Sequence, residues 1–413
     1  MVLSANGLNA LIGFLGSIIV LRNVETELVG IVYPLVGILL MMGQFGDLGV
    51  TISFVKLATD AIRVNGKGAE LEIQNTAILL KLILAIITCI GMFFLSNQIS
   101  VWTFGVPDYH FEVRLIGLGV AFNIFSSFFP SLFQIHEEFS KISFFRVIPN
   151  LIKFISLLLL LFFKSMTLLK LLYAFLMVPL FSLLLGLALG NLRQIIGQFK
   201  LSKTENIKKL LNTSKWIYIS MLTNGLIAQA DILMLSRMVG SEEVAKFVGG
   251  TRLAGMLPIV IGSFITVLMP KVMQAKGTKE LNFFVRKITF IMPVAIGIGT
   301  LAILGSKFII TSVLGAKYQG AIPVFQILIA QFVLDFYVSL ICLIFYRLDK
   351  IHWFSALNFV QLLLNIGLNW IFIPEYGAIG ATVSSFSLRI LALMMAAFGI
   401  VKFGIFPLRE TTD

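Results

Sequence analysis

Charged residues are scarce in this sequence. Only 13% of its 413 residues are charged, whereas 58% are hydrophobic, and the mean hydropathy is +0.98. A water-soluble domain of this length carries a much larger charged fraction. Apolar runs of about 20 residues, long enough to cross a hydrocarbon core of about 30 Å as helices, recur along the chain. These runs are continuous rather than alternating, which excludes a membrane β-barrel. The sequence therefore predicts an all-α integral membrane protein.

Cysteine and histidine are also scarce. The two cysteines, Cys89 and Cys342, lie inside apolar runs, which excludes a disulfide framework and a thiolate metal site. The three histidines, His110, His136 and His352, are far apart and lack the spacing of metal ligands. We therefore expect no metal, no cofactor and no catalytic residues, and we do not expect an enzyme.

Long polar connectors are absent as well, so no extramembrane domain is predicted. Apolar runs define twelve spans, each uncertain by a few residues at its ends. They lie at about 3–21, 29–52, 77–95, 112–133, 146–163, 169–190, 216–238, 248–270, 288–305, 323–345, 354–373 and 379–401.

The basic residues gather in alternate connectors. Of the 32 Lys and Arg residues, 20 fall in one alternating set of connectors and 6 in the other. Short loops rich in Lys and Arg stay on the cytoplasmic side of a membrane. The richer set includes the C-terminal tail, and the number of spans is even. Both termini are therefore predicted to be cytoplasmic.

The chain divides near its middle. A basic connector, 191–215, is interpreted as a cytoplasmic linker lying on anionic headgroups, with a partner-binding site as the alternative. It separates an N-terminal six-helix lobe, 1–190, from a C-terminal six-helix lobe, 216–413. Connector motifs recur between the halves at an offset of about 210 residues. Equivalent helices then share one orientation, which predicts a parallel pseudo-repeat of the kind that forms transporter cavities.

Ionisable residues inside the spans are the strongest functional signal. A charge at the centre of a bilayer costs about 2.5–3.5 kcal/mol, so such residues usually face a polar interior. Asp231 is too short to reach the membrane surface easily, whereas Arg237 and Arg252 can extend toward it. Lys81 lies near the end of its predicted span, where extension toward the headgroups would also satisfy it.

Polar residues follow helical stripes in at least five spans, because positions four and seven apart share a face. A hydrated central groove is favoured over purely structural hydrogen bonding between helices. These stripes are Asn123, Ser127 and Ser131; Ser220, Asn224 and Asp231; Gln331, Asp335 and Ser339; Asn358, Gln361, Asn365 and Asn369; and Thr382, Ser385 and Arg389.

Basic residues outnumber acidic ones within the spans. A groove with this bias favours an anionic group, above all phosphate, which arginine grips with two hydrogen bonds. Two acidic residues, Asp231 and Asp335, are expected either to pair with these cations, to titrate for proton coupling or to bind Na⁺. The candidate groove residues for polarity or coupling are Asn224, Asp231, Asp335, Gln361 and Asn365.

Several motifs, in order and at matching spacing over almost the whole chain, resemble one transporter family. They are Gly46-Asp47-Leu48-Gly49 followed by Lys56, Asp231 with Ile232-Leu233-Met234-Leu235, Gly240-Ser241-Glu242, Arg252-Leu253 leading to Met269-Pro270, and the segment from Pro374 to Thr382. The chain resembles the polysaccharide transporter family, the O-antigen and capsule-unit flippases of the multidrug/oligosaccharidyl-lipid/polysaccharide exporter superfamily. The family usually has a short cytoplasmic leader, whereas here an apolar run begins at Leu3.

The resemblance implies a function and its contacts. Family members move a polyprenyl-pyrophosphate-linked oligosaccharide between the leaflets of the bacterial inner membrane by alternating access between two lobes. It implies membrane lipids, H⁺ or Na⁺, and polymerase and chain-length proteins as partners, and no nucleic acid. Their lumen is cationic. By position, Arg22, Arg252 and Arg389 would contact the substrate, with Lys153 in support.

Three rival functions stay open. A multidrug cation antiporter of the same superfamily would be expected to offer acidic or aromatic cavities. A membrane polymerase or glycosyltransferase would need a sizeable outer loop or an interfacial carboxylate and arginine constellation. A receptor or scaffold would not require charges inside several spans.

Overall fold

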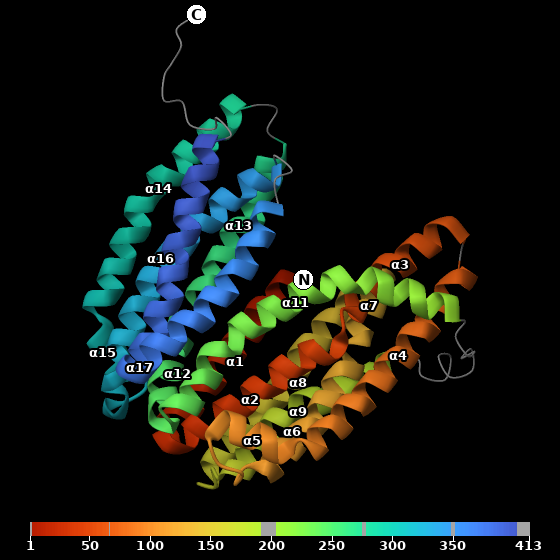
Figure 1. Ribbon diagram of the computed structural model, residues 1–413, viewed down its shortest axis with the longest axis horizontal. Helices are drawn as coiled ribbons and strands as arrows, with labels where there is room; N and C mark the ends of the chain where they lie inside the picture. Colours follow the sequence, from red (N-terminus) through yellow and green to blue (C-terminus); the bar gives the residue numbers. More distant parts are fainter. Residues whose placement is uncertain (1, 66, 191–203, 275–277, 348–351, 403–413) are drawn as a thin grey trace, which may run out of the picture. The chain divides into compact units, whose positions relative to one another are not determined.

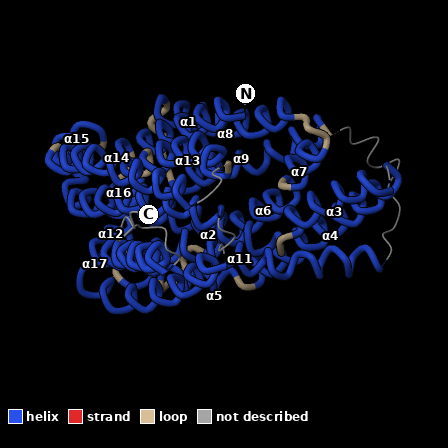
Figure 2. Tube along the Cα trace, turned by 90° about the horizontal axis from the view of Figure 1, so that it is seen from above, coloured by secondary structure: helices blue, strands red, loops and turns tan. Residues whose placement is uncertain are grey.

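The computed structural model describes residues 2–65, 67–190, 204–274, 278–347 and 352–402, and over these ranges the chain is helical, without a β-strand (Figures 1 and 2). The chain forms two compact units, residues 1–241 and residues 242–413. Each unit is described by itself.

The first unit is built from ten helices within its described residues. They are α1 (Val2–Asn23), α2 (Thr26–Asp47), α3 (Val50–Asn65), α4 (Lys67–Phe94), α5 (Ser96–Phe104), α6 (His110–Ser126), α7 (Phe128–Ile135), α8 (Phe139–Phe162), α9 (Leu168–Leu189) and α11 (Thr204–Met238). Main packing partners are α1 with α8, α4 with α6, α8 with α9, and α11 with α2.

The first helix of the second unit is α12 (Ser241–Ala254). Its further helices are α13 (Leu257–Met273), α14 (Thr278–Leu304), α15 (Ser306–Val313), the 3₁₀ turn η1 (Ala316–Ala321), α16 (Ile322–Arg347) and α17 (His352–Lys402). Helix α16 lies at its centre, packed against α13, α14 and α17.

The predicted membrane spans coincide with these helices. Nine helical stretches among the described residues are long and apolar enough to cross a membrane, and they cover ten of the twelve predicted spans. The other two, 216–238 and 248–270, lie on α11 and on α12 with α13. The all-α membrane class is confirmed, whereas the cytoplasmic placement of the termini stays a prediction.

The lobe boundaries at 190 and 216 also remain a prediction. The described part of the basic linker, residues 204–215, is the beginning of α11, and residues 191–203 lie outside the described residues. Helix α11 packs on α2, α3 and α5 of the first unit.

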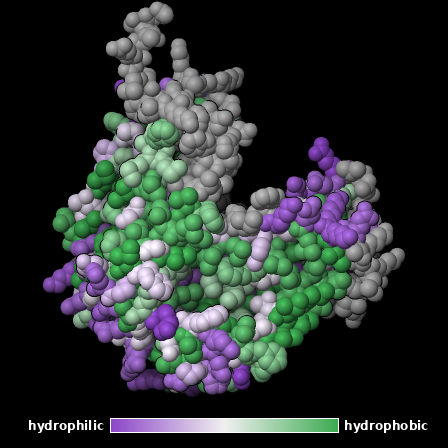
Figure 3. All heavy atoms as spheres, viewed as in Figure 1, coloured by the Kyte–Doolittle hydropathy of each residue, from purple (hydrophilic) through white to green (hydrophobic). Residues whose placement is uncertain are grey.

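Apolar side chains cover the visible membrane-facing helices of each unit, as Figure 3 shows in green. In the first unit, hydrophilic side chains gather over α3 and the beginning of α11, at one end of the helices. Large exposed apolar side chains on α4, such as Ile87, Ile90 and Phe94, are 60%, 51% and 74% exposed. Such exposure is expected where the surrounding solvent is lipid.

Helix α17 contains the boundary between the last two predicted spans. Gly377 has φ +54°, which breaks the helix inside the predicted connector 374–378. The helix beyond this break begins with free backbone N–H groups. The Glu243 carboxylate from α12 accepts one of them, Ala378 N–H, at 2.8 Å, and it also accepts Lys246 Nζ at 2.7 Å. A side chain 135 positions earlier thus caps the last span.

Replacing Glu243 with Ala is therefore expected to lower the free energy of unfolding by about 1–3 kcal/mol, because it leaves the Ala378 N–H without its partner. Thermal unfolding of the purified protein measures this change. The control is Glu242→Ala, because the 75%-exposed Glu242 side chain contacts Lys246 at 3.1 Å and is expected to contribute little. Equal losses for the two variants would contradict the capping role.

Candidate functional site

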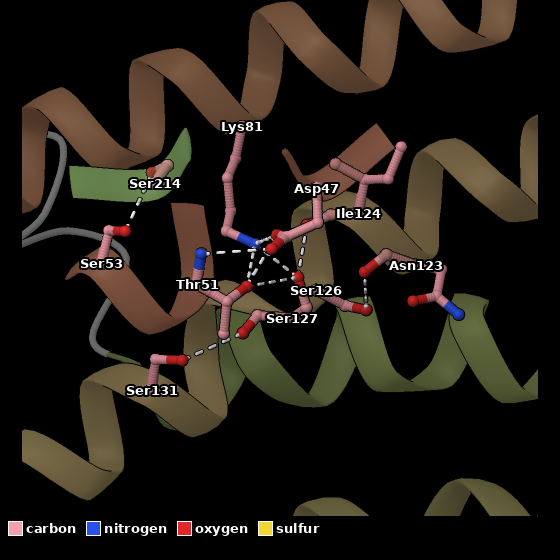
Figure 4. A network of polar contacts seen from close by, with 10 residues as sticks. All are labelled: Asp47, Thr51, Ser53, Lys81, Asn123, Ile124, Ser126, Ser127, Ser131 and Ser214. Atoms are coloured by element: carbon pink, nitrogen blue, oxygen red, sulfur yellow. Dashed lines mark hydrogen bonds and ion pairs between the residues drawn. The ribbon is translucent and has the colours of Figure 1, made fainter. Parts of the chain in front are cut away.

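A buried ion pair joins α2 and α4 in the first unit (Figure 4). The Lys81 side chain, on α4, is fully buried, and its ammonium contacts the Asp47 carboxylate at the end of α2. It also donates to Thr51 Oγ1 at 2.6 Å, Ser127 Oγ at 2.5 Å and the Ile124 carbonyl at 3.3 Å. Four oxygens thus lie within hydrogen-bonding distance of an ammonium that has three hydrogens, which is the condition for burying such a charge.

The pair holds together two helix breaks. Leu48 and Gly49 both have positive φ, +48° and +72°, and they separate α2 from α3. Leucine seldom adopts this conformation, so the surrounding structure must enforce it. Asp47 does so by accepting the Thr51 backbone N–H at 3.2 Å and its hydroxyl at 2.7 Å. The second is slighter: at Ser127, between α6 and α7, the backbone stays in the helical region (φ −64°, ψ −12°) and the Ser127 N–H still donates to the Asn123 carbonyl at 3.0 Å.

Lys81 was expected to extend toward the membrane surface, and this expectation is wrong. Helix α4 begins at Lys67, well before the predicted span, so Lys81 lies in the middle of a helix rather than near its end. Its neighbours on α4 belong to two apolar clusters: Leu80 packs in the cluster that contains Phe54, and Ala85 in the one that contains Ile116. Sequence hydropathy marks where apolar residues begin, not where a helix begins.

A polar cavity of about 440 Å³ adjoins the ion pair. Eight of the eleven residues that line it are polar, although it lies within a bundle of apolar helices. They come from α1, α3, α7, α8, α9 and the α6–α7 break, and Thr51 and Ser127 belong to both the cavity and the Lys81 network. The lining residues are Asn9, Thr51, Ser127, Pro130, Ser131, Gln134, Ile142, Phe145, Arg146, Asn150 and Ser182.

Arg146 is the charged residue of this lining. Its guanidinium donates to Asn6 Oδ1 at 2.7 Å, and its side chain remains exposed. Asn150 lies one helical turn further along α8, and its amide donates to the Arg146 carbonyl at 3.2 Å. Asn9 Oδ1 is buried and makes no hydrogen bond within the described part of the chain. The cavity therefore offers a cation, amides and hydroxyls to a hydrophilic ligand.

Of the predicted stripe on the fourth span, Ser127 and Ser131 reach this cavity. Asn123 instead lies against Gly43 of α2, where an added Cβ would meet its side chain at 3.4 Å. The stripe thus contributes in part to a hydrated cavity and in part to close packing between helices.

The four predicted lumen cations belong to both units. Arg22, in the last turn of α1, and Arg252, in the last turn of α12, are exposed. Lys153, on α8, places its ammonium 5.6 Å from the centre of the Phe175 ring, a cation–π contact. Arg389 belongs to the second unit. Whether the four share one lumen stays a prediction.

Asp335 and Arg389 form an ion pair between α16 and α17. Arg389 Nε lies 3.0 Å from Asp335 Oδ1, and the two side chains, Arg389 and Asp335, are 36% and 16% exposed. Asp335 was expected to pair with a cation, to titrate or to bind Na⁺, and in this geometry it pairs with a cation. Arg389 keeps part of its surface accessible.

The amide stripe of the eleventh span is buried within α17. Gln361, Asn365 and Asn369 are 5%, 1% and 0% exposed. Gln361 Nε2 donates to the Leu388 carbonyl and Asn365 Nδ2 to Ser385 Oγ, both at 3.5 Å. Asn369 Nδ2 donates to Asn365 Oδ1 at 3.3 Å. The first two contacts join the two halves of the broken helix, whereas the Asn358 side chain lies outside the described residues. Whether this stripe also faces a groove stays a prediction.

Asn224 and Asp231 lie on α11. The Asp231 side chain is half-buried, and the side chain of Asn224 is outside the described part of the chain. Their role in coupling stays a prediction.

Arg146 and Asn150 were missed as site residues. Arg146 lies at the first position of the span predicted at about 146–163, so it was counted with the basic residues of the preceding connector rather than as a residue of the helix. Helix α8 in fact begins at Phe139, and residues 146 and 150 are four apart on one helical face. The same spacing that identified the other polar stripes was present here.

Several solved structures have a fold similar to that of this chain. A lipid II flippase, MurJ, in an inward closed conformation has a TM-score of 0.77 at 15% identity, with 96% of this chain and 86% of that chain covered. An inward-facing multidrug resistance MATE transporter of the MOP superfamily also gives 0.77, at 14% identity and 98% and 96% coverage. A MOP superfamily transporter from Pyrococcus furiosus gives 0.62 at 13% identity, with 97% and 94% covered. At these identities the likeness concerns the fold alone.

Sequence comparison identifies the family. None of the curated proteins matches this chain. The profile of a family described as polysaccharide biosynthesis protein matches residues 1–276, about two thirds of the chain, which includes the whole first unit with its ion pair and cavity. The transporter fold and this match agree with the resemblance found in the motifs. The chain belongs to the polysaccharide biosynthesis protein family.

Proposed function

We propose that this protein is a flippase for a polyprenyl-pyrophosphate-linked oligosaccharide repeat unit of O-antigen, capsule or exopolysaccharide. It acts in the bacterial inner membrane and works by alternating access. The observation that carries this proposal is the open pocket of about 440 Å³ among membrane helices, eight of whose eleven lining residues are polar. Polar side chains gathered around one pocket among membrane helices cost free energy unless they meet water or a hydrophilic ligand.

The chemistry of the cavity supports a sugar and phosphate ligand. Amides and hydroxyls, from Asn9, Gln134 and Ser182 among others, both donate to and accept from sugar hydroxyls. Arg146 supplies a guanidinium that binds a phosphate or an acidic sugar with paired hydrogen bonds. The volume lies within the range of about 300–1,000 Å³ found for small-molecule sites.

The alternative is a multidrug cation antiporter, which has the same fold. Arg146 disfavours it, because a guanidinium in the cavity repels a cationic drug. The same positive charge is carried by the predicted lumen residues, Arg22, Lys153, Arg252 and Arg389. A membrane-embedded polymerase or glycosyltransferase is the weaker alternative, because the three similar structures named above are a flippase and two transporters. The lipid-linked oligosaccharide is the substrate we propose, with H⁺ or Na⁺ as a coupling ion and polymerase and chain-length proteins as pathway partners.

Gene deletion tests this proposal. In a host without a redundant flippase, deletion is expected to abolish surface polysaccharide and to cause lipid-linked repeat units to accumulate on the cytoplasmic side. Complementation with the wild-type gene should reverse both effects. Normal surface polysaccharide with unchanged lipid-linked intermediates would refute the proposal. Increased sensitivity to cationic drugs with normal polysaccharide would favour the multidrug alternative.

A further inference from the structure

Four oxygens surround the Lys81 ammonium. They are one carboxylate oxygen of Asp47, the hydroxyls of Thr51 and Ser127, and the backbone carbonyl of Ile124. The two hydroxyl oxygens lie 2.6 and 2.5 Å from Nζ. These two distances fall near the roughly 2.3–2.6 Å at which oxygens ligate Ca²⁺, an ion with about the radius of Na⁺, whereas the Ile124 carbonyl oxygen, at 3.3 Å, would have to move closer to ligate an ion. The single negative charge of these oxygens, on Asp47, balances the positive charge of the ammonium.

These oxygens lie at two irregular points of the helices. Asp47 and Thr51 flank the positive-φ turn between α2 and α3, and Ser127 is itself the residue between α6 and α7, three positions after Ile124 (Figure 4). In transporters, interrupted helices free backbone carbonyls and turn ends that coordinate coupling cations. Carboxylate, carbonyl and hydroxyl oxygens are the ligands that hard cations prefer. The Lys81 ammonium therefore occupies the position that a hard cation would take.

The site also has a route of access. Thr51 and Ser127 line the polar cavity of about 440 Å³ as well as contacting Lys81. A small ion that enters the cavity thus meets two of the four oxygens directly. The other two oxygens, those of Asp47 and Ile124, belong to residues that do not line the cavity.

We propose that this cluster is a monovalent-cation site in which the Lys81 ammonium is a tethered substitute for a bound ion. The ammonium holds the two helix breaks together as Na⁺ would, and the first unit consequently needs no Na⁺ at this position. Removal of the ammonium, with the four oxygens retained, converts the cluster into a site for Na⁺. A purely structural ion pair would have no such property.

Thermal unfolding of the purified full-length protein tests the proposal. Wild type, Lys81→Ala and the double variant Asp47→Asn/Lys81→Ala are compared in NaCl, KCl and choline chloride at equal ionic strength. We expect the same Tm for the wild type in all three salts. Lys81→Ala should unfold at a lower temperature in choline, and Na⁺ should raise its Tm by about 3 °C or more in a saturable manner. The double variant lacks the carboxylate charge and should show no Na⁺-specific rise.

Three results would overturn the proposal: no Na⁺-specific rise for Lys81→Ala, an equal rise for the double variant, or an equal rise for the wild type. If Lys81→Ala yields no folded protein in choline, the variant is solubilised from membranes in NaCl and in choline chloride. Folded protein in NaCl alone supports the site, and unfolded protein in both salts overturns it. The readout is stability, so the result does not depend on what the protein transports.

Discussion

Replacing Asp47 with Ala is expected to lower the free energy of unfolding by about 3–5 kcal/mol, because it leaves the buried Lys81 ammonium without its counter-charge. The loss extends beyond the ion pair. Asp47 also accepts the Thr51 N–H and hydroxyl, so the positive-φ turn at Leu48 and Gly49 loses the contacts that enforce it. Thermal unfolding in detergent and the yield of folded protein measure the effect.

Two controls separate this charge effect from general sensitivity. Asp60→Ala removes an exposed carboxylate from α3 and should change stability by no more than about 0.5 kcal/mol. The double variant Asp47→Leu/Lys81→Met removes both charges together and should recover most of the stability, because apolar replacements of a buried ion pair are often neutral or stabilising. A double variant as unstable as Asp47→Ala would show that the hydrogen bonds of Asp47, rather than its charge, dominate.

Replacing Arg146 with Ala is expected to reduce transport at least about 10-fold while leaving the protein folded. A hydrogen bond to a charged group contributes about 1.5–3 kcal/mol, which corresponds to a factor of about 10 or more in binding. Arg146 is exposed to the cavity rather than packed in a core, so its removal should cost little stability. Arg146→Lys keeps the charge without the paired hydrogen bonds and should retain part of the activity. Complementation of surface polysaccharide at equal expression measures the effect.

Lys141→Ala is the matched control for Arg146→Ala. Lys141 also lies on α8 and also carries a positive charge, but its ammonium contacts Glu138 at 2.7 Å and is not part of the cavity lining. It is expected to complement fully. Full complementation by Arg146→Ala, or equal losses for the two variants, would contradict the role of the cavity in substrate binding.

Hydropathy was enough to predict the helical membrane fold. Runs of about 20 apolar residues leave a helix as the structure that satisfies its own backbone in lipid. The boundary near 374–378 was predicted as well, because Pro374 and Gly377 interrupt an otherwise continuous apolar pattern. Helix breaks at Leu48 and Ser127 were not predicted, since neither residue type marks a break and each depends on contacts from other helices.

The site was predictable only in part. Helical spacing identified Ser127 and Ser131, which do line the cavity. The same reasoning grouped Gln361 and Asn365 with a groove, although both are buried against the other half of α17. Periodicity gives the face of a helix, but it does not say whether a polar face meets water or a partner helix. The partner of Lys81 was missed for the same reason: Asp47 lies 34 positions away, and their contact is set by packing.

Flipping by the purified protein tests the proposed function most directly. The protein is reconstituted into lipid vesicles with a fluorescent polyprenyl-pyrophosphate-linked oligosaccharide, and a membrane-impermeant sugar-modifying reagent reports which molecules have reached the outer leaflet. The account predicts that wild-type vesicles expose the labelled lipid at least about 10-fold faster than Arg146→Ala vesicles, because the guanidinium contributes a charged hydrogen bond. Equal rates for wild-type and protein-free vesicles would contradict it.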